Sequence, residues 1–348
     1  SVIINNSFKK KFKKINIKIP KTLVITTSEF DEFMDKNKLW DFALSCTNNE
    51  LIENKFLNAS LSKKLIKNLR NIIKNISSPI AVRSSGLLED SQYKPLAGMY
   101  STFMLPNSDK KINERLNQIC ESVKRVYAST FFKEPKSLMD SISQRYEEEK
   151  MAVIIMELVG KNHNDIFYPT ISGVCQSYNY YPVSHMERKD GITFLALGLG
   201  KTIAEGGKSL RYSPKFPNIL SQFYSTKSSI NNSQNKFYAL DLNNGQNPMI
   251  QGEKNNLKLF NLEVAEKNGE LNHIANVITT DDNIIRESLN YKGPRILTFS
   301  SIIKYNKNNL NEILIKLMKE GEKLIGCPVE IEFALNLNEQ KKDEFFLL

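Results

Sequence analysis

Apolar residues recur along this chain with two periods, one typical of helices and one typical of strands. Helical spacing predicts helices after Thr26–Ser28 and at Leu61–Ile76, Ile112–Phe132, Ser137–Glu149 and Asn309–Ile325. Short apolar runs predict strands at Thr22–Ile25, Ile80–Val82, Met151–Val159, Ile171–Gln176, Ile192–Leu197, Phe237–Leu242, Val329–Leu335 and Phe345–Leu348. Residues 218–257, rich in Asn, Ser and Gln, are expected to form a partly ordered connector around one of these strands. The pattern is that of a mixed α/β protein whose second half is rich in sheet.

Composition places the chain among ordinary globular proteins. Its 348 residues are enough for two or three subdomains, with 41% apolar and 25% charged residues. The longest apolar run, Met151–Met156, is too short to cross a membrane, and the first residues lack the apolar core of a secretory signal. Cys46, Cys120, Cys175 and Cys327 are scattered, with neither disulfide nor zinc spacing. We therefore expect a cytoplasmic protein without a membrane partner.

The formal net charge of +10 is partly concentrated in Lys9–Lys14. Such a basic cluster is compatible with binding to nucleic acid or to an anionic membrane. However, Asn, Lys and Ile are abundant throughout the chain and no nucleic-acid-binding module is visible, so we expect no nucleic-acid partner. The charge does not decide the question by itself, because a positive field also attracts an anionic nucleotide.

A candidate phosphate site follows the strand at Ile80–Val82. The strand leads into Arg83–Gly86, and a second turn of small residues follows at Ala97–Thr102. The guanidinium of Arg83 is a planar fork of donors that matches phosphate oxygens, and Gly98 lets backbone N–H groups approach closely. A strand that ends in a surface turn with an ordinary surface arginine explains the same residues equally well.

The segment Val329–Phe333 carries a candidate metal site. Its residues alternate with period two, which places Glu330 and Glu332 on one face of a strand and the apolar residues on the other. Two carboxylates on one face form a hard oxygen site that suits Mg²⁺ held partly by protein and partly by nucleotide phosphates. A strand with a solvated acidic face is the equally simple alternative.

Several motifs occur in a fixed order along the chain. They are AVRSS with Glu89-Asp90 and LAGMYSTF, then Met156–Val159, then Gly198–Gly200 with Arg211–Pro214, and finally VEIEFAL with EFFLL. Together they resemble the ATP-binding domain of the phosphoenolpyruvate synthase and pyruvate phosphate dikinase family. The resemblance implies an α/β ATP-grasp fold, in which two lobes hold the nucleotide between them. It implies an N-terminal lobe over residues 1–150, with a helical insert over about 108–150, and a C-terminal lobe with the metal-binding hairpin over 151–348.

The resemblance also implies roles for individual residues. Arg83 and Arg211 would contact phosphate oxygens as the catalytic pair, and Glu330 and Glu332 would bind Mg²⁺. The other candidates would contact ATP: Ser84, Gly98, Met99, Ser101, Thr102, the backbone of Glu157 and Val159 beside adenine, Gly198, Gly200 and Lys201. A carboxylate beside the apolar run, that of Glu157, also needs a polar partner of its own.

The chain departs from the family pattern in places. Relatives often have an acidic residue at the position of Lys201, where we expect an added phosphate contact instead. In relatives the Ser172–Val174 segment leads to a threonine and an arginine, whereas Cys175–Tyr178 follows here, so no role is transferred. The three histidines do not match the phosphorylated histidine of the family, and we interpret them as surface or loop residues: His163, His185 and His273.

Other parts of the family pattern lie outside this sequence. A lysine-bearing GGK-type segment, the Gln and Arg that follow the last strand in relatives, the swivelling phospho-histidine domain and the acceptor domain are absent from it. If the natural protein continues beyond Leu348, we expect the residues that follow to belong to the same site.

These features predict the ATP-binding domain of a phosphoenolpyruvate synthase-like dikinase, a phosphotransferase that uses ATP and Mg²⁺. It would split ATP and pass a phosphoryl group to a histidine on another domain, and finally to pyruvate or a similar acceptor such as glucan. We expect this chain alone to bind ATP·Mg weakly, without complete turnover. Two alternatives stay open: a module of the same fold that senses ATP without transfer, and a basic nucleic-acid-binding protein that depends on Lys9–Lys14.

Overall fold

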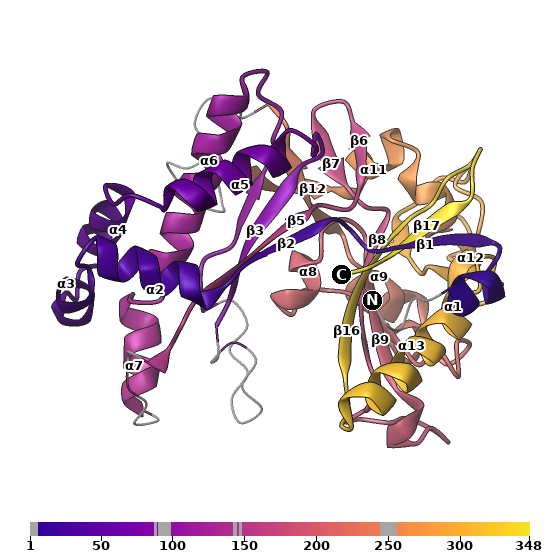
Figure 1. Ribbon diagram of the computed structural model, residues 1–348. Helices are drawn as coiled ribbons and strands as arrows, with labels where there is room; N and C mark the ends of the chain where they lie inside the picture. The colour runs from indigo at the N-terminus through magenta and orange to yellow at the C-terminus, as the bar shows by residue number, and fades with distance from the viewer. Residues whose placement is uncertain (1–5, 87–88, 90–98, 142–144, 146–147, 244–255) are drawn as a thin grey trace. The chain divides into compact units, whose positions relative to one another are not determined.

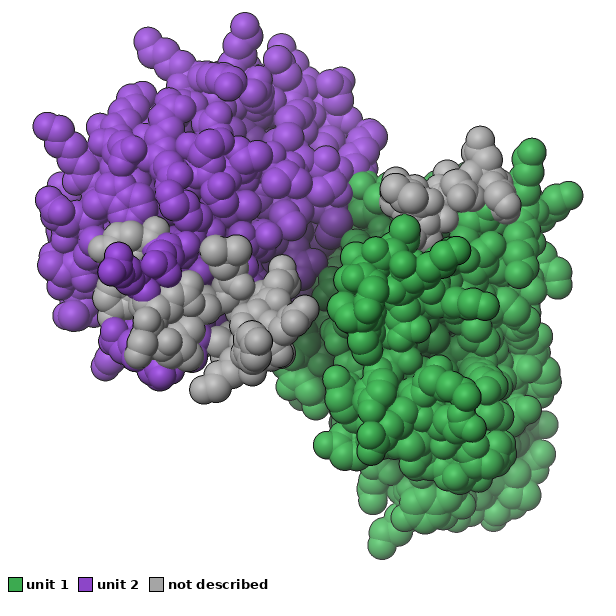
Figure 2. Space-filling view, turned by 60° about the horizontal axis from the view of Figure 1, so that its bottom comes forward, with its two compact units in different colours: residues 1–20, 159–239, 259–348 green, residues 21–158, 240–258 purple. Residues whose placement is uncertain are grey.

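Within the described residues, four β-sheets and the helices around them build the computed structural model. The structure describes residues 6–86, 89, 99–141, 145, 148–243 and 256–348. Contacts group the chain into unit 1 (residues 1–20, 159–239 and 259–348) and unit 2 (residues 21–158 and 240–258), which Figure 2 shows in different colours. The mixed α/β class that the sequence predicts is confirmed. The predicted lobe boundary between residues 150 and 151 stays a prediction. In the contact grouping, the chain enters unit 2 after residue 20 and returns to unit 1 after residue 158.

A four-stranded antiparallel sheet forms the centre of unit 2. Its strand order is β2-β5-β3-β4. The strands are β2 (Thr22–Ile25), β3 (Ile80–Ser85), β4 (Phe103–Leu105) and β5 (Ala152–Glu157). Strand β5 contains most of the longest apolar run of the chain and lies between two neighbours, which is the position that such a run favours.

Helices cover one face of this sheet (Figure 1). In the described part of unit 2 they are α2 (Thr27–Lys36), α3 (Trp40–Ser45), α4 (Asn49–Leu57), α5 (Lys63–Ile73), α6 (Ile112–Ser129) and α7 (Lys133–Ser141). Aromatic rings fill the core beneath them, with the ring of Tyr127 centred 5.0 Å from that of Phe30 and 5.3 Å from that of Phe33. Ile80 and Val82 of β3 belong to the same core. Because side chains alternate along a strand, Ala81 and Arg83 face away from the helices.

The helix boundaries follow local capping chemistry. Ser62 is the N-cap of α5, since its hydroxyl accepts a hydrogen bond from the Leu65 N–H over 3.1 Å. The helix predicted from Leu61 therefore begins only at Lys63. The bounds predicted for the helix at Ser137–Glu149 are wrong, because α7 begins at Lys133 and ends at Ser141; part of the remainder lies outside the described residues.

A six-stranded sheet forms the centre of unit 1. Its order is β1-β17-β16-β8-β9-β10. The strands are β1 (Ile15–Lys18), β8 (Ile171–Gln176), β9 (Ile192–Ala196), β10 (Leu210–Tyr212), β16 (Glu330–Asn336) and β17 (Asp343–Leu347). Strand β1 pairs with β17 in parallel, and the other pairs are antiparallel. Segments from the first twenty and the last twenty residues of the sequence therefore meet in one sheet.

Helix α13 (Leu310–Ile325) packs against one face of this sheet. Gly321 is a point of close approach, since a Cβ there would lie 2.9 Å from Cγ2 of Val329 and 3.4 Å from Cδ1 of Ile331. Phe333, the next alternate residue, is fully buried. The apolar residues of β16 thus face the helix side, as their alternation predicts.

Smaller elements complete the described part of unit 1 and the connection at residues 240–258. They are β6 (Lys161–His163), β7 (Ile166–Tyr168), β11 (Lys236–Asp241), β12 (Leu257–Asn261), β13 (Ala275–Ile278), β14 (Ile285–Arg286), β15 (Arg295–Leu297), α1 (Asn6–Lys11), α8 (Lys201–Ala204), α9 (Thr226–Asn232), α11 (Leu262–Lys267), α12 (Ser300–Ile303) and the 3₁₀ turns η2 (Arg188–Asp190), η3 (Ser221–Phe223) and η4 (Glu270–His273). Their sheets have the orders β12-β11-β7-β6 and β14-β13-β15. Among the helices of the described ranges, none is both long enough and apolar enough to cross a membrane.

Candidate functional site

Glu332 and Arg211 lie in one row across the six-stranded sheet. Glu332 of β16 pairs with Val174 of β8, which pairs with Phe194 of β9. Phe194 in turn pairs with Arg211 of β10. Directly opposed residues of antiparallel strands point to the same face, so all four side chains share one face. The two ends of the row are three strand spacings apart, about 14 Å between backbones.

This face of the sheet is the accessible one. Glu330 and Glu332 are exposed, and the other members of the row are half-buried. On the opposite face, Cys175, Leu195 and Tyr212 are buried almost completely. The sheet therefore has one packed and one open face, and the predicted acids and Arg211 are on the open face.

Glu330 is the second carboxylate on the open face. Gln176, its register partner on β8, donates a hydrogen bond from Nε2 to Glu330 Oε2 over 2.6 Å. No group of three or more His, Cys, Asp or Glu side chains that could hold a metal ion occurs in the part of the chain that the structure describes. Two carboxylates are hard oxygen donors that fit Mg²⁺ when a ligand such as a phosphate supplies further oxygens.

Arg211 is oriented by neutral partners. Its Nη2 donates to Asn179 Oδ1 over 3.2 Å and to the Tyr181 carbonyl oxygen over 2.9 Å. The guanidinium carbon also lies 5.9 Å from the centre of the Tyr181 ring. None of these contacts cancels the positive charge, so the guanidinium is both held and able to attract an anion.

The glycine loop after β9 is shaped by a close backbone contact. Gly198 has a φ of +84°, and a Cβ there would lie 2.6 Å from the carbonyl oxygen of Tyr238. The N–H of Leu199 donates to the same oxygen over 2.9 Å. Gly200 differs, because its φ is −59° and the atom nearest to an added Cβ is Cβ of Ser172, 3.9 Å away. The fold itself requires glycine at position 198 but not at position 200.

Lys201, the departure from the family pattern, begins α8. Its Nζ lies 3.6 Å from Glu205 Oε1 and 5.7 Å from the centre of the Tyr238 ring. The Tyr238 hydroxyl donates to Glu205 Oε2 over 2.8 Å. Glu205 thus balances the added positive charge locally, and the phosphate contact of Lys201 stays a prediction.

In unit 2, Arg83 and Ser84 point to opposite faces of β3. Arg83 is half-buried on the face turned away from the helices. Ser84 is 6% exposed, and its hydroxyl donates to Glu89 Oε1 over 3.1 Å. Because neighbouring strand residues alternate, a ligand that meets the Arg83 side chain could meet Ser84 only through its backbone.

The described part of the predicted phosphate loop is anchored to unit 2. Gly98 lies outside the described residues, and Met99 packs against the helical core. The N–H of Ser101 donates to Ser129 Oγ over 3.1 Å, and Thr102 is half-buried. Contacts of Met99, Ser101 and Thr102 with a ligand stay predictions.

The predicted adenine-binding residues are close in sequence but belong to different units, Glu157 to unit 2 and Val159 to unit 1. The Glu157 carboxylate accepts hydrogen bonds from the Ser78 hydroxyl over 3.0 Å and from the Lys21 N–H over 3.3 Å. The partner expected for this carboxylate is therefore present. The Glu157 N–H donates to the Lys21 carbonyl over 3.0 Å, so the base would have to meet other backbone atoms.

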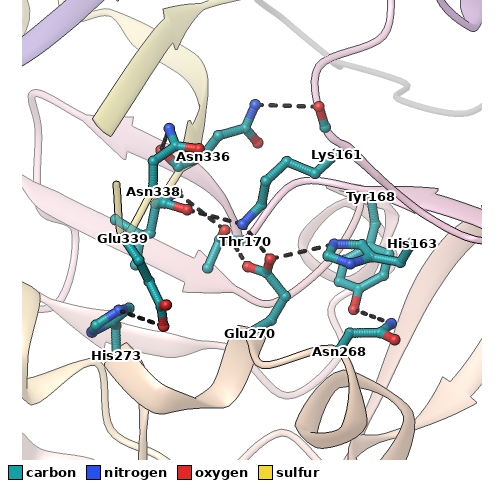
Figure 3. Close-up of polar contacts among 12 residues, drawn as sticks. Lys161, His163, Tyr168, Thr170, Asn268, Glu270, His273, Asn336, Asn338 and Glu339 are labelled. Carbon is teal, nitrogen blue, oxygen red and sulfur yellow. Dashed lines mark hydrogen bonds and ion pairs between the residues drawn. The ribbon is translucent and has the colours of Figure 1, made fainter. Parts of the chain in front are cut away.

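A buried cluster of charged side chains lies elsewhere in unit 1 (Figure 3). Glu270 is 5% exposed, and its carboxylate contacts Lys161 and the Thr170 hydroxyl. His163 Nε2 lies 3.3 Å from Glu270 Oε1. Burial raises the pKa of Glu270, but His163, Lys161 and Thr170 together outweigh it and hold the pKa below its ordinary value.

The same cluster holds the end of the acidic strand. Lys161 Nζ donates to the Leu337 carbonyl over 2.9 Å, and the Leu337 N–H donates to Thr170 Oγ1 over 3.2 Å. Leu337 directly follows β16, the strand that carries the two acids. The cluster therefore helps to fix the position of that strand.

The sequence pattern did not predict this cluster. The interpretation of His163 as a surface or loop residue is wrong, since the side chain is only 12% exposed and lies on β6. Lys161 and His163 are two apart and thus share a face, which was the available local signal. Their acidic partner is about one hundred residues away, and no local pattern points to it.

Two hollows of unit 1 lie outside the row. One, of about 580 Å³, is lined in part by Tyr291 and Arg295, and Arg295 is already bound by Glu266 over 2.6 Å. Another, of about 470 Å³, lies beside β1 and includes Lys18 and Lys342. Neither contains a residue that the sequence predicted for the site.

Comparison with known proteins identifies relatives of the whole chain and of part of it. The family model described as pyruvate phosphate dikinase, AMP/ATP-binding domain, matches residues 5–348. The uncharacterized phosphotransferase YvkC of Bacillus subtilis (strain 168) is 24% identical over 199 residues, which cover 56% of this chain and 21% of that protein. The chain thus matches only about a fifth of the length of this curated relative.

Proposed function

The chain belongs to the family of pyruvate phosphate dikinase AMP/ATP-binding domains, which has an ATP-grasp-like fold, and on this premise we propose that it binds ATP together with Mg²⁺. We further propose that it takes part in splitting ATP, so that a phosphoryl group passes to a histidine on a domain outside this sequence and finally to pyruvate or a similar acceptor. Recognition of the family from sequence motifs is confirmed by the family match.

The shared face of Glu330, Glu332 and Arg211 is the observation that carries this proposal. A triphosphate with a divalent cation needs both a cationic group for its oxygens and carboxylates for the metal. The open face of unit 1 offers both at the ends of one row, with Val174 and Phe194 between them.

In the proposed site, Arg211 binds phosphate oxygens through its planar fork. Glu330 and Glu332 hold Mg²⁺, which when bound neutralises charge on the phosphate groups. Gly198 gives the adjacent loop its shape, while Gly200 and Lys201 offer a backbone and a cation to the nucleotide. Transfer chemistry of this kind depends mainly on positioning and charge, which these residues supply.

The other proposed ligand contacts are made by residues of unit 2 and by Val159 of unit 1. We propose that Arg83 contacts phosphate oxygens, as do backbone groups of Ser84 and of residues 98–102. The backbone beside Glu157 and Val159 is proposed for adenine. Support for these contacts comes from the family match, which covers all of these residues.

A calorimetric titration tests the proposal. ATP is titrated into the wild-type chain and into Glu332→Gln, each with and without Mg²⁺. We expect Mg²⁺ to strengthen ATP binding by the wild type and to lose most of that effect in Glu332→Gln, because the variant keeps the shape of the side chain but not its charge. Glu344→Gln is the matched control, since Glu344 lies on β17 of the same sheet and pairs with Lys18.

Each outcome of the titration is decisive. Absence of ATP binding by the wild type would remove the proposed function. If Mg²⁺ does not change the ATP affinity of either protein, the assignment of Glu330 and Glu332 to Mg²⁺ fails, while ATP remains the ligand.

A further inference from the structure

Gln176 meets Glu330 on the open face of the six-stranded sheet. The two residues oppose each other in the register of β8 and β16, and Gln176 Nε2 donates to Glu330 Oε2 over 2.6 Å. Opposed residues of an antiparallel pair have Cα atoms about 5 Å apart. The contact therefore follows from the backbone register and not from a chance meeting of long side chains.

The bond leaves the two oxygens of Glu330 in different situations. Oε2 accepts from the amide, and among the described residues no hydrogen bond to Oε1 is found, so this oxygen is available for a further partner. A hydrogen bond to one oxygen of a carboxylate fixes the direction in which the other oxygen points. Hydrogen-bond partners commonly orient metal ligands in this way.

The chemistry of the amide suits this task. A glutamine amide donates without carrying charge, so Glu330 keeps its full negative charge. A lysine or arginine at this position would instead neutralise the carboxylate and compete with a cation. The second acid, Glu332, has an apolar register partner instead, because it lies opposite Val174 on β8.

The hydrogen bond between Gln176 and Glu330 is expected to contribute little to the stability of the fold. Glu330 is exposed and Gln176 is half-buried, and exposed polar pairs contribute little to folding. Loss of the bond should thus leave the fold almost unchanged, and any sizeable effect should be seen only with ligand.

We propose that Gln176 is a positioning residue that fixes Glu330 for Mg²⁺ in the Mg²⁺·ATP site. This inference rests on the proposed function. It adds a residue for which the sequence motifs implied no role, and it leaves Glu330 Oε1 as the oxygen that would be available to a metal ion.

Mg²⁺ dependence of ATP binding tests the role. The Mg²⁺ concentration that gives half-maximal ATP binding is measured by calorimetry for the wild type, Gln176→Met and Gln176→Lys. For Gln176→Met, which keeps the length of the side chain without the donor, we expect an increase on the order of tenfold. For Gln176→Lys, we expect Mg²⁺ to lose most of its effect, because the ammonium neutralises Glu330.

Controls separate positioning from folding. Asn117→Ala removes an exposed amide on α6 of unit 2 and should leave the Mg²⁺ requirement unchanged. The unfolding midpoint of each variant is measured in parallel, and ATP affinity of Gln176→Met at saturating Mg²⁺ should stay close to that of the wild type.

The inference and the proposed function fail in different ways. If the wild type shows Mg²⁺-dependent ATP binding and both Gln176 variants share its Mg²⁺ requirement, the role of Gln176 is overturned and the function stands. If the wild type shows no Mg²⁺-dependent binding, the metal site and the role of Gln176 are overturned together. A shift confined to the Mg²⁺ requirement, with unchanged unfolding, supports the role.

Discussion

Glu332 and Arg211 stand at the two ends of one cross-strand row, on the face of the six-stranded sheet that α13 leaves open. Strand register alone produces this relationship. A slip of one residue in any of the three strand pairs would turn one end of the row to the packed face. Interactions that hold the register, even far from the row, are therefore part of what builds the candidate site.

Loss of the Arg211 guanidinium should weaken ATP binding strongly. A hydrogen bond to a charged group contributes about 1.5–3 kcal/mol, so we expect Arg211→Ala to bind ATP on the order of tenfold to hundredfold more weakly. Calorimetry at low and at high salt measures the effect, which should shrink as salt screens the wild-type attraction. Tyr181→Ala, which removes only the stacked ring, serves as the control and should change ATP affinity much less. Equal affinities of Arg211→Ala and the wild type would contradict the phosphate role.

Glycine at position 198 should be needed for folding of its loop. Gly198→Ala places a Cβ against the carbonyl of Tyr238 at a positive φ, and we expect a loss of about 2 kcal/mol or more in the free energy of unfolding. Gly206→Ala is the matched control, because Gly206 has a φ of +69° but no atom within 4 Å of an added Cβ. Its cost should be only that of the left-handed backbone, about 1 kcal/mol. Urea unfolding of both variants checks the difference, and equal costs would refute the close contact.

Breaking the charged cluster around Glu270 should lower the free energy of unfolding, whereas replacing both charges by apolar side chains should lower it much less. Lys161→Met leaves a buried carboxylate with fewer partners, and we expect a loss on the order of 3 kcal/mol in unfolding free energy. The double variant Lys161→Met/Glu270→Leu should recover much of this loss, since it removes both charges. Lys18→Met, which breaks an exposed pair with Glu344, should cost less than about 1 kcal/mol. Additive effects of the two cluster changes in chemical unfolding would show that the side chains do not interact.

Acid should weaken unit 1 through the same carboxylate. Burial pushes the pKa of Glu270 up, yet contacts with His163, Lys161 and Thr170 hold it below its ordinary value of 4.5. As pH falls, the unfolded chain takes up this proton first, so the stabilising contribution is complete above about pH 4.5 and is lost as pH falls through the folded pKa. Urea unfolding from about pH 7 to about pH 3 should show a shallower decline for Glu270→Gln than for the wild type. Identical slopes for the two proteins would rule out this contribution.

Much of the secondary structure was readable from the sequence, because the apolar pattern there is also the burial pattern. The strand at Ile171–Gln176 is observed with its predicted bounds, and so is the strand at Thr22–Ile25. Alternation at Val329–Phe333 correctly separated the acidic from the apolar face. The family itself could be recognised because its motifs are local runs of sequence.

The pairing of distant segments could not be read in the same way. Nothing local connects Lys161 with Glu270, or Gln176 with Glu330, since strand order and register decide both contacts. The short helices α3 and α4 were also missed, because each shows too few turns for a periodic pattern. The sequence predicted Gly198 as a residue that contacts a ligand. The structure shows that glycine is also needed there for packing against the carbonyl of Tyr238, which no sequence pattern indicates.

The parallel pairing of β1 with β17 has a consequence for biosynthesis. The ribosome releases residues 15–18 long before residues 343–347, so the six-stranded sheet cannot be completed until translation has passed residue 347. All strands of the β2-β5-β3-β4 sheet emerge within residues 22–157, and that sheet can assemble co-translationally. A nascent chain would thus carry one formed sheet and one with an unsatisfied edge, which is the stage at which chaperones and aggregation compete for it.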